Sequence, residues 1–344
     1  MRTNRWTRSL GISLAVSTLI LGIGYPLGGA VQASAPAHPA HLTSVTLVLK
    51  WVPQAQFAGY FIALDKGYYA QQGLNVTIKP GGPEVTPENV VAGGGAQFGI
   101  DWMSALLAAR DRGLPIVNIA QIFQASGMRI ITFKKSGINT IYKFQGHTVG
   151  VWFAGNEYQF FALEHKYHLK NIHVVSEPFV MTPFLTGKMD VAQAMTYNEI
   201  GVVLEHGVSR SQLNIFDYNQ LGVSILEDGI FATSSYLKSH GAIAVKFLRA
   251  SIKGWQYALA HPVEAGAISF RHAPAGTTTL FHQKYMAKEV NKLIMYGPGL
   301  SHTIGYMGPN LFRRTWTTLL QQKVIKHAPS GAYTQVYWQQ AGGH

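Results

Sequence analysis

The sequence predicts an α/β protein with two lobes that face each other across a cleft. Two observations support this fold class. Strand patterns alternate with helix patterns from residue 45 to residue 233, which is typical of largely parallel sheets. The 344 residues are enough for about two domains, and 47% of them are hydrophobic, so each domain can bury a core.

The first 33 residues have the layout of a secretory signal peptide. Three arginines among the first eight residues precede an apolar run over residues 10–21, and small residues near position 33 form a cleavage pattern. A membrane anchor is the alternative interpretation. However, Gly22, Gly24 and Pro26 interrupt the run, which leaves it short of the roughly 20 residues that span a bilayer. We therefore expect an exported, periplasmic protein with a disordered tail at residues 34–44.

The first lobe begins with strands and short helices in turn. We expect strands at residues 45–49, 74–78, 98–100 and 116–123, and helices at 57–66, 88–93 and 102–110. A further strand at 129–133 follows, at the point where the chain is expected to cross to the second lobe.

The second lobe repeats this alternation, and the chain then returns to the first. We expect strands at 148–152, 172–175, 191–195 and 214–216, with helices at 157–167, 182–186 and 198–205. A strand at 229–233 leads back to helices at 242–260, 263–272, 283–295 and 310–323. The first lobe is therefore predicted to hold residues 45–131 and 229–344, and the second lobe residues 132–228.

Composition excludes several classes of function. The chain has no cysteine, which rules out a disulfide framework, a zinc–thiolate site, an iron–sulfur cluster and a catalytic thiol. The net charge is +12, but the basic residues are scattered and form no stripe along a helix. A nucleic-acid partner is therefore not expected. No metal site and no cofactor are predicted either.

Aromatic and polar residues follow several of the expected strands. In open α/β sheets, ligands bind beyond the carboxyl ends of the strands. The candidate ligand-binding residues are Trp51, Gln54, Phe57, Tyr60, Asp101, Trp102, Gln124, Trp152, Phe153, Asn156, Glu157, Tyr197, Asn198 and Glu199. Aromatic rings offer stacking area, while the amides and carboxylates offer directional hydrogen bonds.

Three of these candidates have an equally good structural interpretation. Asp101 suits the N-cap of the helix that follows it, Trp152 suits a core position, and Glu199 suits the favourable first turn of a helix. None of the candidate segments contains Arg or Lys, which a sulfonate or nitrate site would need. A neutral or weakly basic heteroaromatic ligand is therefore favoured.

Three motifs in this order carry a family resemblance. They are W-x-P-x-x-x-x-A-G-Y from Trp51, D-K-G-Y-Y-x-x-x-G-L-N-V from Asp65, and G-x-x-x-F-G-I-D ending at Asp101. The order resembles solute-binding proteins of ABC importers. More narrowly, it is similar to the family that binds thiamine pyrimidine precursors and is related to the yeast pyrimidine synthase. The resemblance runs from about residue 45 to 260 and is strongest over 45–125.

The resemblance implies a type II periplasmic binding protein with a hinge and an interlobe ligand cleft. It implies a small-molecule ligand, an ABC permease with its ATPase as partners, and a monomer. Family members typically carry W-x-P-N-x-x-H, whereas this chain has Gln54 in place of Asn and Phe57 in place of His. The related enzymes use that histidine with a cysteine-rich motif, so we expect a receptor and not a synthase.

Several alternatives stay open at this stage. The ligand that the resemblance favours is a thiamine pyrimidine precursor, but riboflavin, sulfonate and nitrate binders look similar. A pyrimidine-synthase-like enzyme and a periplasmic sensor that signals to a membrane kinase share the same scaffold.

Overall fold

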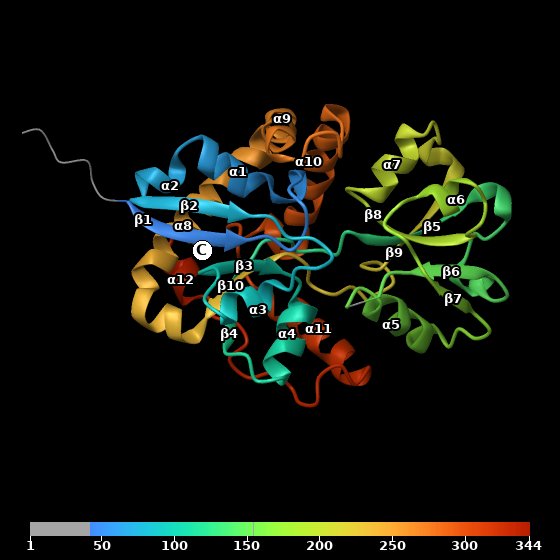
Figure 1. Cartoon of the computed structure of the whole chain (residues 1–344). Helices are drawn as coiled ribbons and strands as arrows, with labels where there is room; N and C mark the ends of the chain where they lie inside the picture. The colour runs from blue at the N-terminus through green and yellow to red at the C-terminus, as the bar shows by residue number, and fades with distance from the viewer. Residues whose placement is uncertain (1–41, 154) are drawn as a thin grey trace, which may run out of the picture. The chain divides into compact units, whose positions relative to one another are not determined.

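The computed structural model describes residues 42–153 and 155–344. The signal peptide expected at residues 1–33 lies outside the described residues, as does the expected tail up to residue 41. Two five-stranded sheets form the framework of the described chain, and their strands are labelled in Figure 1. Within residues 42–153 and 155–344, no helix is long and apolar enough to cross a membrane.

The first sheet has the strand order β2-β1-β3-β10-β4. Its strands are β1 (Thr43–Val48), β2 (Leu74–Lys79), β3 (Phe98–Asp101), β4 (Ile116–Gln121) and β10 (Gly229–Thr233). β1 is parallel to β2 and β3, whereas β10 is antiparallel to β3 and β4. Alternate residues of β1, such as Val45 and Leu47, are buried, as the period of two in a half-buried strand requires.

The second sheet has the strand order β7-β6-β8-β5-β9. Its strands are β5 (Met128–Phe133), β6 (Thr148–Val151), β7 (His173–Ser176), β8 (Val191–Met195) and β9 (Leu213–Asp217). β6 is parallel to β7 and β8, and β5 is antiparallel to β8 and β9. We call this sheet with its helices the second lobe, and the first sheet with its helices the first lobe.

Helices pack on both sheets. Those of the first lobe are α1 (Ala58–Asp65), α2 (Tyr68–Gln71), α3 (Pro87–Ala92), α4 (Met103–Asp111), α8 (Ser234–Ala260), α9 (Pro262–His272), α10 (Leu280–Ile294), α11 (Pro309–Gln321) and α12 (Val336–Gln340). The second lobe has α5 (Tyr158–Tyr167), α6 (Thr182–Leu185) and α7 (Glu199–Glu205). α1 and α8 can approach closely because Gly59 and Gly254 lack side chains. A Cβ at Gly59 would overlap the Trp255 ring, and a Cβ at Gly254 would overlap the Gly59 carbonyl oxygen.

The order of the expected elements is confirmed, although α2 and α12 were not expected. Three further differences concern the lobe boundaries and the start of α8. β1 begins at Thr43, so the expected tail cannot extend to residue 44. β5 pairs only with strands of the second sheet, so the chain leaves the first lobe before residue 128 and not after residue 131. α8 begins at Ser234, eight residues before the expected start, with a non-helical residue at His240.

Each sheet is parallel except for one strand, and that strand is the first after a crossing. β5 follows β4 of the first sheet, and β10 follows β9 of the second sheet. Parallel neighbours need a crossover connection, usually a helix. A chain that enters a sheet directly from the other lobe has no such crossover, so it pairs antiparallel.

The two crossings are joined to each other by buried hydrogen bonds. The Glu227 carboxylate accepts from the Ser126 hydroxyl at 2.5 Å and from the Gly127 N–H at 2.9 Å. The Gln121 amide donates to the Glu227 carbonyl at 2.6 Å. Burial raises the pKa of Glu227 to about 7. Hydrogen bonds therefore link the two crossing segments, residues 122–127 and 218–228, at the place where a hinge is expected.

Candidate functional site

A cavity of about 300 Å³ lies where the carboxyl ends of strands from both sheets meet. Elements of the first and second lobes contribute equally to its lining. The lining residues are Lys50, Trp51, Gln54, Gln56, Gly82, Pro83, Val85 and Trp102 from the first lobe, and Trp152, Phe153, Asn156, Phe179, Met195, Tyr197, Asn198 and Glu199 from the second. The volume is at the lower end of what small-molecule sites usually have.

Nine of the fourteen candidates from the sequence line this cavity. They are Trp51, Gln54, Trp102, Trp152, Phe153, Asn156, Tyr197, Asn198 and Glu199. They come from four separate strand ends, those of β1, β3, β6 and β8. The fold thus brings segments that are far apart in the sequence to one cavity, as expected if ligands bind beyond the carboxyl ends of the strands.

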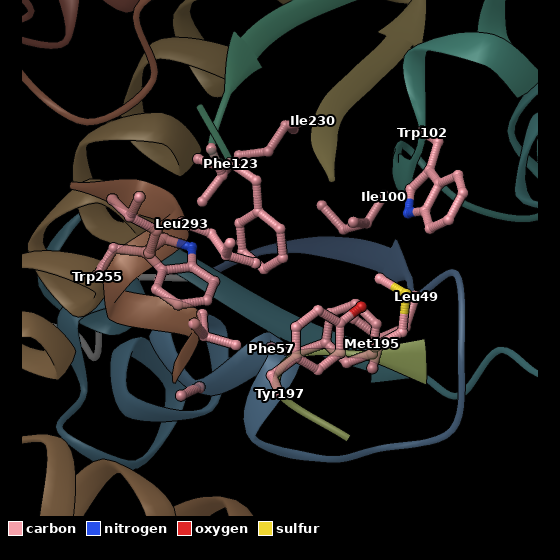
Figure 2. Close-up of a cluster of buried hydrophobic side chains, with 14 of the residues drawn as sticks. Leu49, Phe57, Ile100, Trp102, Phe123, Met195, Tyr197, Ile230, Trp255 and Leu293 are labelled. Atoms are coloured by element: carbon pink, nitrogen blue, oxygen red, sulfur yellow. The ribbon is translucent and has the colours of Figure 1, made fainter. Parts of the chain in front are cut away.

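Phe57 and Tyr60 do not line the cavity, because the turn at residues 55–57 and the helix α1 that follows it direct these side chains into the core. Phe57 is completely buried, and Figure 2 shows it in the same hydrophobic cluster as Leu49 and Tyr197. The Tyr60 ring packs edge-on against Trp255 with ring centroids 5.5 Å apart. Both residues support the cavity wall from behind.

Asp101, Gln124 and Glu157 also lie outside the lining. Asp101 does not cap α4, whose N-cap is Trp102 without a side-chain hydrogen bond. Gln124 is buried and donates to the carbonyl of Tyr306 at 2.9 Å. The Glu157 carboxylate accepts from the Gly155 N–H at 2.8 Å and so holds the turn before α5. The Gln124 amide N–H and the Glu157 carboxylate are thus engaged within the protein, whereas Oε1 of Gln124 is buried without a hydrogen-bond partner.

Three of the aromatic rings that line the cavity lie close together. Trp51 follows β1 in the first lobe, and Trp152 follows β6 in the second. Phe179, which lies after β7, contacts both: its ring centroid is 5.0 Å from that of Trp51 and 6.2 Å from that of Trp152. Trp152 also belongs to the main buried cluster, so it serves the core and the cavity wall together.

Glu199 provides a buried carboxyl group at the cavity. Its two oxygens accept from the Met195 N–H at 2.9 Å and from the Asn198 amide at 2.6 Å. Burial raises the pKa of Glu199 to about 7, although these hydrogen bonds oppose the rise. The Asn198 Oδ1 lies 2.9 Å from Nε2 of His282 on α10, which ties this edge of the cavity to the first lobe.

Lys50 brings a cation to the cavity that the sequence analysis did not expect. Its Nζ lies 2.8 Å from the Asp101 carboxylate and 4.6 Å from the ring centre of Trp102. Burial alone would lower the pKa of Lys50, but the ion pair and hydrogen bond with Asp101, together with the charges of Asp228 and Glu88, outweigh it and the pKa is raised. The lysine is thus charged and already paired. Because Lys50 covers one face of Trp102, this tryptophan offers a ligand less stacking area than Trp51 or Trp152.

Four of the residues that sequence reasoning missed follow strand ends that it did not search. Gly82, Pro83 and Val85 follow β2, and Phe179 follows β7. The strand-end rule applies equally to these positions and could have found them. Gln56 and Met195 lack such a signal, because their position depends on how residues 55–57 turn and on where β8 ends.

Solved structures with a similar fold include periplasmic binding proteins. One is the periplasmic aliphatic sulphonate binding protein SsuA from Escherichia coli, with a TM-score of 0.64, 13% identity, and coverage of 87% of this chain and 91% of that one. At this identity the likeness concerns the fold alone. Fold and cavity together define the class: a two-lobe α/β protein of the periplasmic binding type with its cavity between the lobes.

The chain belongs to the family described as NMT1/THI5 like, which matches residues 54–265. A riboflavin-binding protein, RibY, of Chloroflexus aurantiacus is 25% identical over 84% of each chain. A formylaminopyrimidine-binding protein of Halalkalibacterium halodurans is 23% identical over 74% of this chain and 76% of its own. A 4-amino-5-hydroxymethyl-2-methylpyrimidine phosphate synthase of Saccharomyces cerevisiae is 26% identical over 70% and 74%. The family thus contains proteins named as receptors and proteins named as enzymes.

Proposed function

We propose that the chain is the exported solute-binding component of an ABC importer and that it captures a thiamine pyrimidine precursor in the cavity between its lobes. One observation carries the proposal: aromatic rings from both lobes face a cavity that also holds the buried carboxyl group of Glu199. A planar ring with amino groups fits this arrangement, because it stacks on the aromatic walls and donates hydrogen bonds to the carboxylate.

The role of each residue follows from its position. Trp51 and Trp152 supply the stacking surfaces of the two lobes. Glu199, when ionised, accepts a hydrogen bond from an exocyclic amine, and the amides of Gln54 and Asn198 complete the ring's polar edge. The names of the formylaminopyrimidine-binding and riboflavin-binding relatives support a heteroaromatic ligand.

An anion is a weaker candidate for the ligand. Among the described residues that line the cavity, Lys50 is the one cation, and its charge is already paired with Asp101 at 2.8 Å. A sulfonate or nitrate would have to share that cation with a buried carboxylate, which costs electrostatic energy. Riboflavin is the stronger alternative, because its flat ring system uses the same walls and a relative carries its name.

Transport and not catalysis is the activity that this chemistry favours. The synthase-like alternative depends on a histidine and a cysteine-rich motif in the related enzymes, and this chain has Phe57 at the histidine position and no cysteine. A ligand that contacts both lobes stabilises the state in which they are closed on it, and an ABC permease with its ATPase would recognise that state. A sensor that reports to a membrane kinase would use the same closure.

A thermal-shift screen of the purified protein tests this proposal. The panel holds formylaminopyrimidine, hydroxymethylpyrimidine, thiamine, riboflavin, taurine, an alkanesulfonate and nitrate. A ligand at 100 times its dissociation constant should stabilise the protein by about 2.7 kcal/mol, which is a clear shift. We expect the largest shift with a pyrimidine. A shift with riboflavin alone would keep the receptor and change its ligand, and a shift with anions alone would contradict the proposal.

A further inference from the structure

Phe179 is the most exposed aromatic residue of the cavity. It has 52% of its surface exposed, compared with 5% for Trp152. Its contacts nevertheless lie on the cavity side, where its ring meets Trp51 of the first lobe and Trp152 of its own lobe. The Phe179–Trp51 contact therefore crosses from one lobe to the other at the cavity.

The backbone on both sides of Phe179 is held in place. The Glu177 N–H donates to the Val151 carbonyl at 3.1 Å, and the Trp152 indole N–H donates to the Pro178 carbonyl at 3.4 Å. On the other side, Met181 is buried at 3% exposure. The chain thus presents a short, anchored tip whose aromatic side chain can change rotamer without a rearrangement of the loop.

The Glu177 side chain strengthens this anchor. Its carboxyl group accepts from the Gln193 N–H on β8 at 2.7 Å, and Gln193 in turn accepts from the Trp152 N–H at 2.7 Å. The tip and the Trp152 wall are therefore attached to the same central strand of the second sheet. A ligand held between Trp51 and Trp152 would meet a Phe179 whose starting position is fixed.

We propose that Phe179 is the clasp of the cavity: its ring packs on a planar ligand bound between the two tryptophans and retards the release of that ligand. The proposal rests on the proposed function, because it needs a ligand with an aromatic face. Its energetic basis is the aromatic contact itself and the apolar area that the exposed ring buries on the ligand. Phe179 thus contacts the ligand directly and sets the lifetime of the complex.

The clasp predicts a kinetic effect that is confined to dissociation. Removal of the ring in Phe179→Ala should raise the dissociation rate constant roughly 3- to 10-fold, the range expected for one aromatic contact. The association rate constant should stay within about twofold, because the ring contacts the ligand only after the ligand has entered the cavity. Phe179→Tyr should restore the slow release, and Phe179→Leu should restore it only in part.

Stopped-flow fluorescence measures both rate constants, with riboflavin and formylaminopyrimidine as probes. Val180→Ala is the matched control, because Val180 is adjacent, 58% exposed and absent from the cavity lining. Equal dissociation rates in the Phe179→Ala variant and the unsubstituted protein would overturn the clasp, as would an equal acceleration in Val180→Ala. If the unsubstituted protein bound neither probe, the proposed function would fail and the clasp with it, so the two failures are distinguishable.

Discussion

The protein should become less stable as the pH rises from 5 to 9. Burial raises the pKa of five carboxyl groups far above their ordinary values, to about 7 for Glu199, Glu227 and Asp228, about 8 for Glu88 and about 9 for Glu177. Each unit of pKa difference between the folded and unfolded states corresponds to about 1.4 kcal/mol. The loss of stability with rising pH is therefore the largest pH effect that the structure predicts.

The direction follows from proton binding in the two states. Between about pH 4.5 and pH 9 the folded state holds protons on these groups that the unfolded state has already released. The stabilisation is fully present below the unfolded pKa and is lost as the pH rises through the folded values. The profile is thus opposite to that of proteins whose carboxylates form ion pairs.

Urea denaturation at constant ionic strength from pH 5 to pH 9 measures this profile. In Glu177→Gln the decline should be shallower, because the group with the highest pKa of the five no longer titrates. Glu84→Gln, at an exposed position, should leave the profile unchanged. A free energy of unfolding that rises between pH 5 and pH 8 would contradict the burial of these groups.

Glu199→Gln should weaken the binding of an aminopyrimidine by roughly 10- to 100-fold, which is the range for a hydrogen bond to a charged group. The variant keeps the size of the side chain and one acceptor oxygen, so it retains one of the two hydrogen bonds that Glu199 accepts from Met195 and Asn198. Circular dichroism checks that the fold persists. Glu199→Gln removes the negative charge that, in the proposed complex, accepts a hydrogen bond from the ligand amine. Isothermal titration calorimetry with formylaminopyrimidine measures the difference.

The pH dependence of binding gives a second test of Glu199. Because the ligand amine prefers the ionised carboxylate, binding should weaken as the pH falls below about 7, where this group takes up a proton in the free protein. In Glu199→Gln that dependence should disappear. Glu157→Gln is the control, since Glu157 holds the Gly155 turn and does not line the cavity. Equal losses in both variants would refute the role of Glu199.

Most of the fold could be predicted from local patterns. Val45 and Leu47 alternate with polar residues in β1, and Gly67 and Gly113 end helices where expected. The direction of β5 could not be predicted, because pairing depends on tertiary contacts with β8 and β9. The early start of α8 has a local cause: Thr233 caps the helix by accepting from the Tyr236 N–H, but Gly241 interrupts the helical pattern in the sequence.

The site was predictable where a residue's position along a strand decides its role. Trp51, Trp152 and Glu199 follow strand ends and line the cavity. Phe57 and Tyr60 follow β1 as Trp51 does, but their direction depends on how residues 55–57 turn and on the rotation of α1, which sequence spacing did not resolve. The pairing of Lys50 with Asp101, 51 residues apart, emerges only when β1 and β3 lie side by side.

The most direct test of the central claim is a calorimetric titration of the purified protein with formylaminopyrimidine, followed by recovery of the ligand and mass spectrometry. The proposed receptor should bind one ligand per chain, return it chemically unchanged, and lose most of its affinity in Trp51→Ala and Trp152→Ala. Binding that survives both substitutions would place the ligand elsewhere, and a chemically altered ligand would show an enzyme in place of a receptor.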